Sequence, residues 1–276
     1  MRITDSTAMD WKSYHHPREG TLEVKTLARG TAGDINFNFT LTRYGSGGDD
    51  PFETPRHRHT FEQFRMPIEG ALNYGPDRDI PEGWVTYFPA DASYGPQKVD
   101  RCVVLLCQYG KEYLTSAQYK TAYAELAAVG EFHDGVFTET DPATGKARNQ
   151  DAVTAVFERA LGHPLDHGRP RYPEPVLMDP AAFSWRPAPD DRGVELKRLG
   201  TFTENETSVS LVRWTADGTF GLEPDRAQLV VSLQPGVEID GATYPALTGV
   251  TSNIGDEVAL GGSPGTEALV VTLPRS

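Results

Sequence analysis

The fold of this 276-residue chain is decided by one stretch, Pro55-Arg56-His57-Arg58-His59-Thr60-Phe61-Glu62-Gln63-Phe64-Arg65-Met66-Pro67-Ile68-Glu69-Gly70. Residues two apart on a strand share a face, so His57 and His59 project together while Arg58 points away. Two neighbouring imidazoles on one face are half of a divalent-metal site. No other part of the chain gathers metal-capable residues as densely.

This stretch resembles the first conserved motif of the cupin superfamily, which reads His-x-His, three or four residues, an acidic ligand, six residues and Gly. Gln63 stands four places after His59, and Gly70 stands seven places after Gln63, so the spacing is kept. Gln63 replaces the usual Glu, and some cupins use Gln as a ligand there. The resemblance implies a β-barrel with a metal site inside it.

The second cupin motif, Gly-x5-Pro-x-Gly-x2-His, is only partly matched by the segment from Glu82 to Gln97. Gly83 and Pro89 are in place. Asp91 occupies the position of the second Gly, and Tyr94 occupies the position of the last metal-binding His. The resemblance therefore leaves the fourth ligand of the site open.

The resemblance implies one divalent metal ion (Fe, Mn, Ni or Zn) held by His57, His59 and Gln63. Two neutral imidazoles and a neutral amide leave the +2 charge of the ion uncompensated, so an anionic or chelating substrate is expected to complete the shell. The alternatives are an exposed pair of histidines on a polar strand and, for Gln63, a core amide that only forms hydrogen bonds.

Two further residues are predicted to be catalytic, Tyr94 and Arg65. Tyr94 could ligate the metal as a phenolate or could line the site and hydrogen-bond the substrate. Arg65 shares strand parity with Gln63, so it is either paired with a carboxylate inside the barrel or anchors a substrate carboxylate. Tyr87 and Gln97 are predicted, with Arg65, to bind the substrate at the barrel mouth.

Bulk properties restrict the partners and the compartment. The formal net charge of -13 and the pI near 5.0 argue against nucleic acid or an anionic membrane as a partner. Cys102 and Cys107 have opposite strand parity, so they are expected to be buried free thiols in a reducing compartment. The chain shows no apolar amino-terminal segment and no long apolar run, which predicts a soluble cytoplasmic protein.

Short stretches of alternating apolar and polar residues predict strands in both halves of the chain. In the first half they cover 22–28, 34–44, 62–68, 83–88 and 102–108, and in the second half 194–202, 207–214, 228–233, 237–239, 250–254 and 268–273. Between the halves, a capping box from Thr115 to Gln118 opens a helix expected to run to Gly130, and a second helix is expected from about Asn149 to Leu161, ending at Gly162. Four prolines from 164 to 175 predict an irregular linker. Residues 1–20, with the His15-His16 pair, are expected to form an exposed polar arm.

The second half is predicted to be a barrel that has lost its metal site. Gly236 resembles the Gly that closes the first cupin motif, and counting back seven places gives Leu229 at the ligand position. The two histidine positions then hold Glu223 and Asp225, and no histidine follows His167.

The predicted fold is therefore all-β, with two double-stranded β-helix (cupin or jelly-roll) barrels and a helical insert between them. The expected parts are an N-terminal barrel with the metal site (1–112), the insert and linker (113–172) and a C-terminal barrel without ligands (173–276). The favoured function is that of a mononuclear metal-dependent, dioxygenase-like oxidoreductase acting on a small organic molecule, although the family also includes isomerases and decarboxylases. The alternatives are a small-molecule binder whose metal site has decayed and a metal-free isomerase that uses Tyr94 with a barrel carboxylate. A homodimer formed through sheet edges is a possible assembly.

Overall fold

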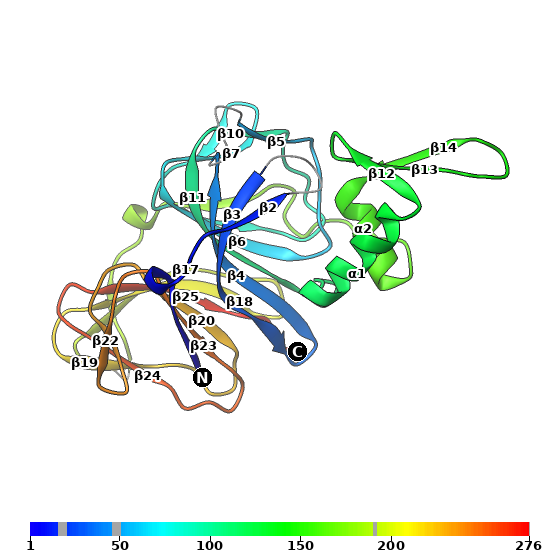
Figure 1. Ribbon diagram of the computed structural model, residues 1–276. Coiled ribbons are helices and arrows are strands. Elements are labelled where there is room, and N and C mark those ends of the chain that lie inside the picture. The colour runs from blue at the N-terminus through cyan, green and yellow to red at the C-terminus, as the bar shows by residue number, and fades with distance from the viewer. Residues whose placement is uncertain (16–20, 46–50, 190–191, 276) are drawn as a thin grey trace. The chain divides into compact units, whose positions relative to one another are not determined.

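The computed structural model describes residues 1–15, 21–45, 51–189 and 192–275, and it is built mainly of strands (Figure 1). Residues 46–50 lie outside the described residues, as does His16 of the His15-His16 pair. No described helix has both the length and the apolar character needed to cross a membrane.

The first barrel is built on a seven-stranded sheet with two small ladders beside it. The sheet order is β15 (Val176–Met178), β9 (Val85–Phe88), β6 (Glu62–Glu69), β11 (Cys102–Gly110), β4 (Ile35–Tyr44), β3 (Thr21–Ala32) and β2 (Lys12–His15). The ladders pair β10 (Gln97–Val99) with β5 (Phe52–Thr54) and β7 (Leu72–Gly75) with β8 (Arg78–Ile80). All five strands predicted in this half are present.

The interior of the first barrel takes the alternate residues of its strands. Leu106 on β11 lies opposite Arg65 on β6, and both contribute to the inner face. The buried apolar cluster on this face contains Leu22, Tyr44, Phe52, Leu72, Ile80, Phe88, Tyr94, Val99, Cys102, Val104 and Leu106. Alternation along β6 thus sends Gln63 and Arg65 into this cluster, and Phe64 and Met66 pack on the opposite face.

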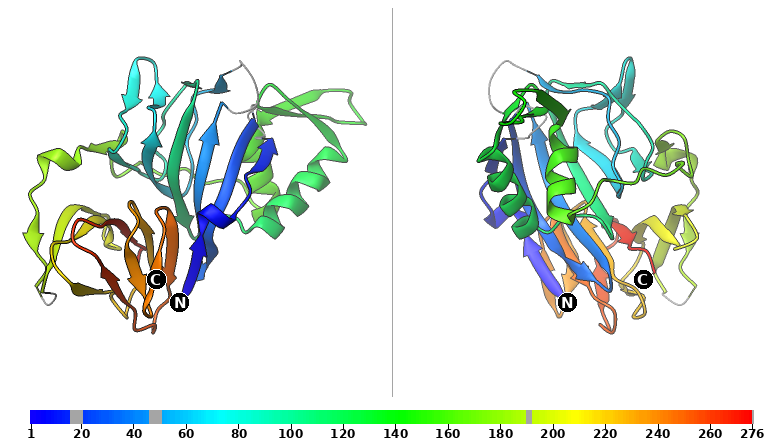
Figure 2. Two further views of the ribbon diagram at one scale, coloured as in Figure 1. Left: turned by 60° about the vertical axis from the view of Figure 1, so that its left-hand side comes forward. Right: turned by 90° about the vertical axis from the view of Figure 1, so that its right-hand side faces the viewer.

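The second barrel is built on another seven-stranded sheet. Its order is β1 (Arg2–Asp5), β23 (Thr248–Ser252), β20 (Gln228–Ser232), β25 (Glu267–Thr272), β18 (Thr207–Trp214), β17 (Val194–Phe202) and β16 (Arg186–Pro187). A four-stranded sheet accompanies it, in the order β19 (Gly218–Gly221), β24 (Ala259–Gly262), β21 (Val237–Ile239) and β22 (Ala242–Tyr244). Figure 2 shows these strands from two sides, in yellow to red except for β1, which is blue.

The core of the second barrel corrects the position assigned to Leu229. Val230, and not Leu229, belongs to the apolar cluster around Trp214. The residues of β20 that face the interior are therefore shifted by one position from the predicted alignment. Gln228 shares the face of Val230. Its amide accepts from the backbone N–H of Glu223 at 2.6 Å and donates to Thr272 Oγ1 at 3.0 Å, so it is held as part of the core.

The amino-terminal segment is not the polar arm that its composition predicts. β1 pairs antiparallel with β23, with Arg2 opposite Thr251 and Asp5 opposite Thr248, and it is followed by a short 3-10 helix, Ser6–Ala8. By contacts, Met1–Asp10, Lys25–Thr40 and Met178–Ser276 form one unit, and Trp11–Val24 and Leu41–Leu177 form the other. Two segments from the first 40 residues thus belong to the same unit as the second half of the chain. The boundaries 1–112, 113–172 and 173–276 stay a prediction.

The insert contains the two predicted helices and a small sheet that the sequence did not reveal. α1 (Ser116–Ala127) begins with both hydrogen bonds of the capping box, and α2 (Ala152–Leu161) ends at Gly162, which has φ 76°. α1 is shorter than predicted because Gly130 opens β12 (Gly130–His133), which pairs with β13 (Val136–Thr140) and β14 (Ala147–Asp151). Figures 1 and 2 show the helices side by side in green. These strands are largely exposed, so their sequence lacks the apolar alternation that predicts a strand.

The two cysteines are free and buried, as predicted. Burial raises the pKa of the Cys102 thiol to about 12, with the nearby carboxylates of Glu69 and Glu82 adding to the rise, and burial also raises the pKa of Cys107. Only the thiolate is nucleophilic, so neither thiol is expected to react with Ellman's reagent in the folded protein at pH 8. Both should react after unfolding in guanidinium chloride; fast reaction of either thiol in the native protein would contradict this prediction.

Candidate functional site

The predicted site residues come from three neighbouring segments of the first barrel. His57 and His59 lie between β5 and β6, Gln63 and Arg65 lie on β6, and Tyr94 lies between β9 and β10. The segment of His57 is fixed to that of Tyr94 by a pair of backbone hydrogen bonds, each 3.0 Å long. This short antiparallel bridge brings both histidines to the end of β6 from which Gln63 points inward.

His57, His59 and Tyr94 lie in contact through their rings. The centroids of the two imidazoles are 5.1 Å apart, and the His57 ring is 4.4 Å from the Tyr94 ring. His59 also stacks on Phe61 at 4.4 Å, and Phe61 belongs to the apolar core of the insert together with Phe157. The insert therefore fixes the orientation of His59, which is a role that the sequence did not reveal.

A buried polar network connects Arg65 with Gln63 and Tyr94. The guanidinium donates from Nε and Nη2 to Gln63 Oε1, at 3.0 and 2.7 Å, and from Nη2 to the Tyr94 hydroxyl oxygen at 2.7 Å. Gln63 Nε2 donates to the same hydroxyl oxygen at 3.3 Å. The relative exposure of the three residues is 5, 1 and 5 %, so this network lies inside the barrel, whereas His57 and His59 are half-buried at its edge.

The hydrogen bonds of the histidines assign their proton positions. His57 Nδ1 lies 2.7 Å from the carbonyl oxygen of Pro55, which can only accept, so Nδ1 carries a proton. His59 Nε2 lies 3.1 Å from the Tyr94 hydroxyl. That hydroxyl already accepts from Arg65 and Gln63, so it donates its own proton to His59 Nε2.

Arg65 carries a buried positive charge that no described carboxylate neutralises. All its polar contacts go to Gln63 and Tyr94, and its Nη1 has no hydrogen-bond partner among the described residues. Its guanidinium carbon lies over the rings of Phe88, at 4.3 Å, and Tyr94, at 5.1 Å. Tyr44 also lies close, but burial raises the pKa of its phenol to about 12 although Arg65 opposes the rise, so Tyr44 is neutral at physiological pH.

Two of the predicted substrate-binding residues lie outside this cluster. Tyr87 pairs with Phe64 across the ladder and donates a short hydrogen bond to Glu62, on the face of β6 opposite to Arg65. Burial and the negative charge of Glu62 both raise the pKa of the Tyr87 phenol. Strand parity could have excluded Tyr87, because its neighbour Phe88 is the residue that lies opposite Gln63. Phe88 belongs to the buried apolar cluster, and its ring also lies 4.3 Å from the guanidinium carbon of Arg65.

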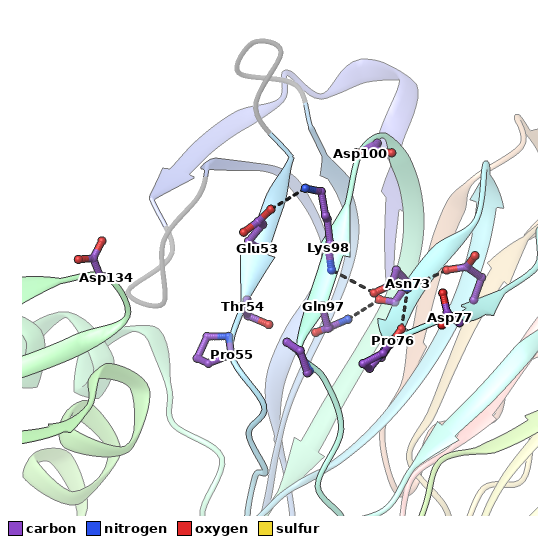
Figure 3. Close-up of a pocket in the computed structure, with 13 residues that line it drawn as sticks. Glu53, Thr54, Pro55, Asn73, Pro76, Asp77, Gln97, Lys98, Asp100 and Asp134 are labelled. Carbon is purple, nitrogen blue, oxygen red and sulfur yellow. Dashed lines mark hydrogen bonds and ion pairs between the residues drawn. The ribbon is translucent and has the colours of Figure 1, made fainter.

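Gln97 lines a separate surface recess of about 720 Å³, which Figure 3 shows in close-up. Its Nε2 donates to the backbone oxygen of Asn73 at 2.7 Å, and Lys98 beside it pairs with Glu53 at 3.0 Å. The recess is also lined by Thr54, Pro55, Gly75, Pro76, Asp77, Asp79, Pro96, Asp100 and Asp134. The recess is not lined by His57, His59, Gln63, Arg65 or Tyr94. Gln97 and Arg65 therefore do not line a common site.

The Pro-rich linker touches the cluster through a contact that the sequence did not predict. Asp91 has φ 64°, the left-handed conformation suited to the Gly that the second cupin motif has there. Its backbone N–H donates to the His59 carbonyl oxygen at 2.7 Å, and its carboxylate contacts His167 Nδ1 at 2.9 Å. The linker is thereby tied to the loop that carries Tyr94.

In this arrangement the cluster does not fit a divalent cation. Gln63 Oε1, the predicted ligand atom, takes two N–H bonds from Arg65, and His59 Nε2 takes the proton of Tyr94. The described residues contain no group of three His, Cys, Asp or Glu placed to hold a metal. A dication on Gln63 Oε1 would lie beside the Arg65 guanidinium, which bonds to the same oxygen, and the two positive charges would repel each other. Ligation by His57, His59 and Gln63 therefore stays a prediction without support from this geometry.

Comparison with solved structures shows which fold this is. A Nostoc punctiforme protein provisionally assigned as a dioxygenase aligns over 99% of this chain and 82% of its own, with a TM-score of 0.64 and 12% identity. Streptomyces albus HEPD, with 2-hydroxyethylphosphonate and Fe(II) bound, aligns over 100% and 76% at a TM-score of 0.56 and 15% identity. Lactobacillus farciminis oxalate decarboxylase in complex with formate aligns over 99% and 86% at a TM-score of 0.52 and 11% identity. Neither family models nor curated proteins give a match by sequence.

The chain therefore has the cupin fold. Two seven-stranded sheets, each with its own buried core, give it the two-barrel form that the sequence predicts. Gly70, which closes the first motif, has the left-handed conformation (φ 75°) that favours glycine.

Proposed function

We propose that the first barrel binds a small organic anion, of which a carboxylate is the simplest form, with Arg65 as the anchor. One observation carries this proposal: the guanidinium is buried and no described carboxylate pairs with it. A buried charge without a counterion costs several kcal/mol, and a guanidinium matches the geometry of a carboxylate or phosphate group. An anionic ligand would supply the missing charge. The Streptomyces albus and Lactobacillus farciminis structures also hold small anions, a phosphonate and formate.

The other polar groups of the cluster would orient the ligand. The Tyr94 hydroxyl and the half-buried imidazoles of His57 and His59 lie between Arg65 and the edge of the barrel. Nη1 is covered in this conformation, so ligand binding requires a local rearrangement of the side chains around it. If the protein is an isomerase that acts on the bound anion, Tyr94 would carry the proton, because its hydroxyl is hydrogen-bonded to both His59 and Arg65.

Calorimetric titration with a series of small mono- and dicarboxylates and inorganic phosphate tests this proposal. At least one carboxylate is expected to bind saturably to the wild-type protein, and Arg65→Met should weaken that binding by roughly 30-fold or more. The matched control is Arg43→Met. Arg43 is also partly buried, but it pairs with Glu23 at 2.8 Å, so its loss should leave the binding unchanged. If no anion binds, or if both variants bind as the wild type does, the proposal is wrong.

A second candidate function is a metal-dependent, dioxygenase-like oxidoreductase, as the sequence predicts. It is favoured by the adjacency of the two imidazoles, 5.1 Å apart at the barrel edge, and by the cupin fold shared with an Fe(II)-bound enzyme. Elemental analysis of protein purified without a histidine tag tests it. Iron, manganese, nickel or zinc near one equivalent, absent from the His57→Ala/His59→Ala variant, would support it; no metal after reconstitution would exclude it.

A further inference from the structure

We propose that the Arg65 guanidinium takes the place of a metal ion in the first barrel, so that this site uses a side-chain cation and excludes a divalent metal. This inference deepens the proposed function and rests on it only for the charge of the ligand. The positive charge comes from the protein itself, from the strand that also carries Gln63.

The hydrogen bonds of the guanidinium show the replacement. The two oxygens that face the interior at this end of the barrel, Gln63 Oε1 and Tyr94 Oη, are atoms that could ligate a metal. Together they take three N–H bonds from Arg65, at 2.7 to 3.0 Å. A metal ion and the guanidinium would compete for the same lone pairs, and an arginine is always charged, so it cannot give way by losing a proton.

The surroundings stabilise a monovalent, planar cation better than a compact dication. Phe88 and Tyr94 present their rings to the guanidinium at 4.3 and 5.1 Å, and ring faces attract a flat, weakly hydrated cation without neutralising it. Hard divalent ions instead require oxygen or nitrogen ligands with negative charge nearby. The nearest acid along β6, Glu62, is hydrogen-bonded to Tyr87 on the opposite face.

The same geometry explains why an amide at position 63 suits this barrel. A glutamate there would form an ion pair with Arg65 and cancel its charge. Gln63 holds the guanidinium by two hydrogen bonds and leaves its charge available to a ligand. Gln63 thus positions Arg65 to attract an anion. We expect this attraction to be lost if either residue is replaced.

Metal binding by designed variants tests the inference. Cobalt(II) is the probe, measured by equilibrium dialysis and by its visible absorption, with elemental analysis as a second readout. The wild-type protein is expected to bind no cobalt that depends on His57 and His59. The double variant Gln63→Glu/Arg65→Met removes the cation and supplies a carboxylate, so it should bind cobalt at least tenfold more tightly than the wild type. Adding His57→Ala and His59→Ala to the double variant should abolish the gain.

One control variant tests whether the charge of Arg65 is what excludes the metal. Gln63→Glu alone retains Arg65, so it should gain no cobalt binding but should lose anion binding, because the new carboxylate occupies the guanidinium. Circular dichroism confirms that each variant is folded. Absence of stoichiometric cobalt from the wild-type protein supports the inference without any variant, and the His57→Ala/His59→Ala variant is needed only if the wild-type protein binds cobalt.

The outcomes for the inference and for the proposed function are distinct. Stoichiometric metal in the wild-type protein that is lost in His57→Ala/His59→Ala overturns the inference, even if an anion still binds at Arg65. Absence of anion binding, with no metal either, overturns the proposed function and leaves the exclusion of metal intact. Anion binding without metal, together with the gain in the double variant, supports both.

Discussion

Gln63→Leu is expected to destabilise the protein by about 3–5 kcal/mol, although leucine has nearly the same size as glutamine. The change removes the oxygen that accepts from both Nε and Nη2 of the buried Arg65 guanidinium and leaves Tyr94 Oη as its remaining acceptor among the described residues. A buried charge that loses its hydrogen-bond acceptor cannot be rehydrated, because Gln63 and Arg65 are 1 and 5 % exposed. Equilibrium unfolding in urea, followed by circular dichroism, measures the change in the free energy of unfolding.

The double variant Gln63→Leu/Arg65→Met should recover most of this loss, because it removes the charge together with its acceptor. The control is Gln97→Leu. Gln97 is also buried, but among the described residues its amide donates to the neutral backbone oxygen of Asn73, at 2.7 Å, and to no charged group, so its replacement should cost about 1–3 kcal/mol. Additive effects of the Gln63 and Arg65 changes would show that the two side chains do not act as a unit.

Trp214→Ala is expected to destabilise the second barrel by about 3–5 kcal/mol. Trp214 is fully buried at the centre of the apolar cluster of that barrel. Its ring packs directly on Gly262, where an added Cβ would lie 2.5 Å from the ring, and a glycine has no side chain that could move into the space that the substitution leaves. The free energy of unfolding and the heat of the corresponding calorimetric transition report this loss.

The control for this substitution is Trp185→Ala in the same unit. Trp185 is only half-buried, and it stacks with Lys197 at 4.9 Å and with Arg213 at 4.3 Å. Such partly exposed cation–π contacts contribute about 0.5–1 kcal/mol each, so its loss should be much smaller. Equal effects of the two substitutions would contradict the assignment of Trp214 as the centre of the core.

The gathering of the candidate site could be predicted from strand parity and spacing. His57, His59, Gln63 and Tyr94 do meet at one end of the first barrel, and Arg65 points to the same interior as Gln63. The sequence could not predict whether Arg65 would pair with a carboxylate of the barrel or stay available to bind a ligand. That choice depends on which acids lie across the barrel, and Glu62 bonds to Tyr87 on the opposite face.

Contacts between distant segments account for what the sequence did not reveal. The pairing of β1 with β23 joins residues about 250 positions apart, and nothing in a polar amino-terminal sequence identifies its partner strand. The contact of His167 with Asp91, 2.9 Å long, likewise joins a proline-rich linker to a barrel loop. Leu229 was placed in the wrong register because an alignment by one glycine leaves an uncertainty of one residue, which exchanges the two faces of a strand.

The sequence by itself determined the class of fold, the strands of both barrels, the helices of the insert and the set of polar residues that meet in the first barrel. Periodicity and turn chemistry are local, so they can be derived from a few neighbouring residues at a time. Only the tertiary structure decided which cation occupies the first barrel. The hydrogen bonds of Gln63, Arg65 and Tyr94 are set by how three segments close on one another, and the charge of a site is the sum of groups that the chain brings together from all of them.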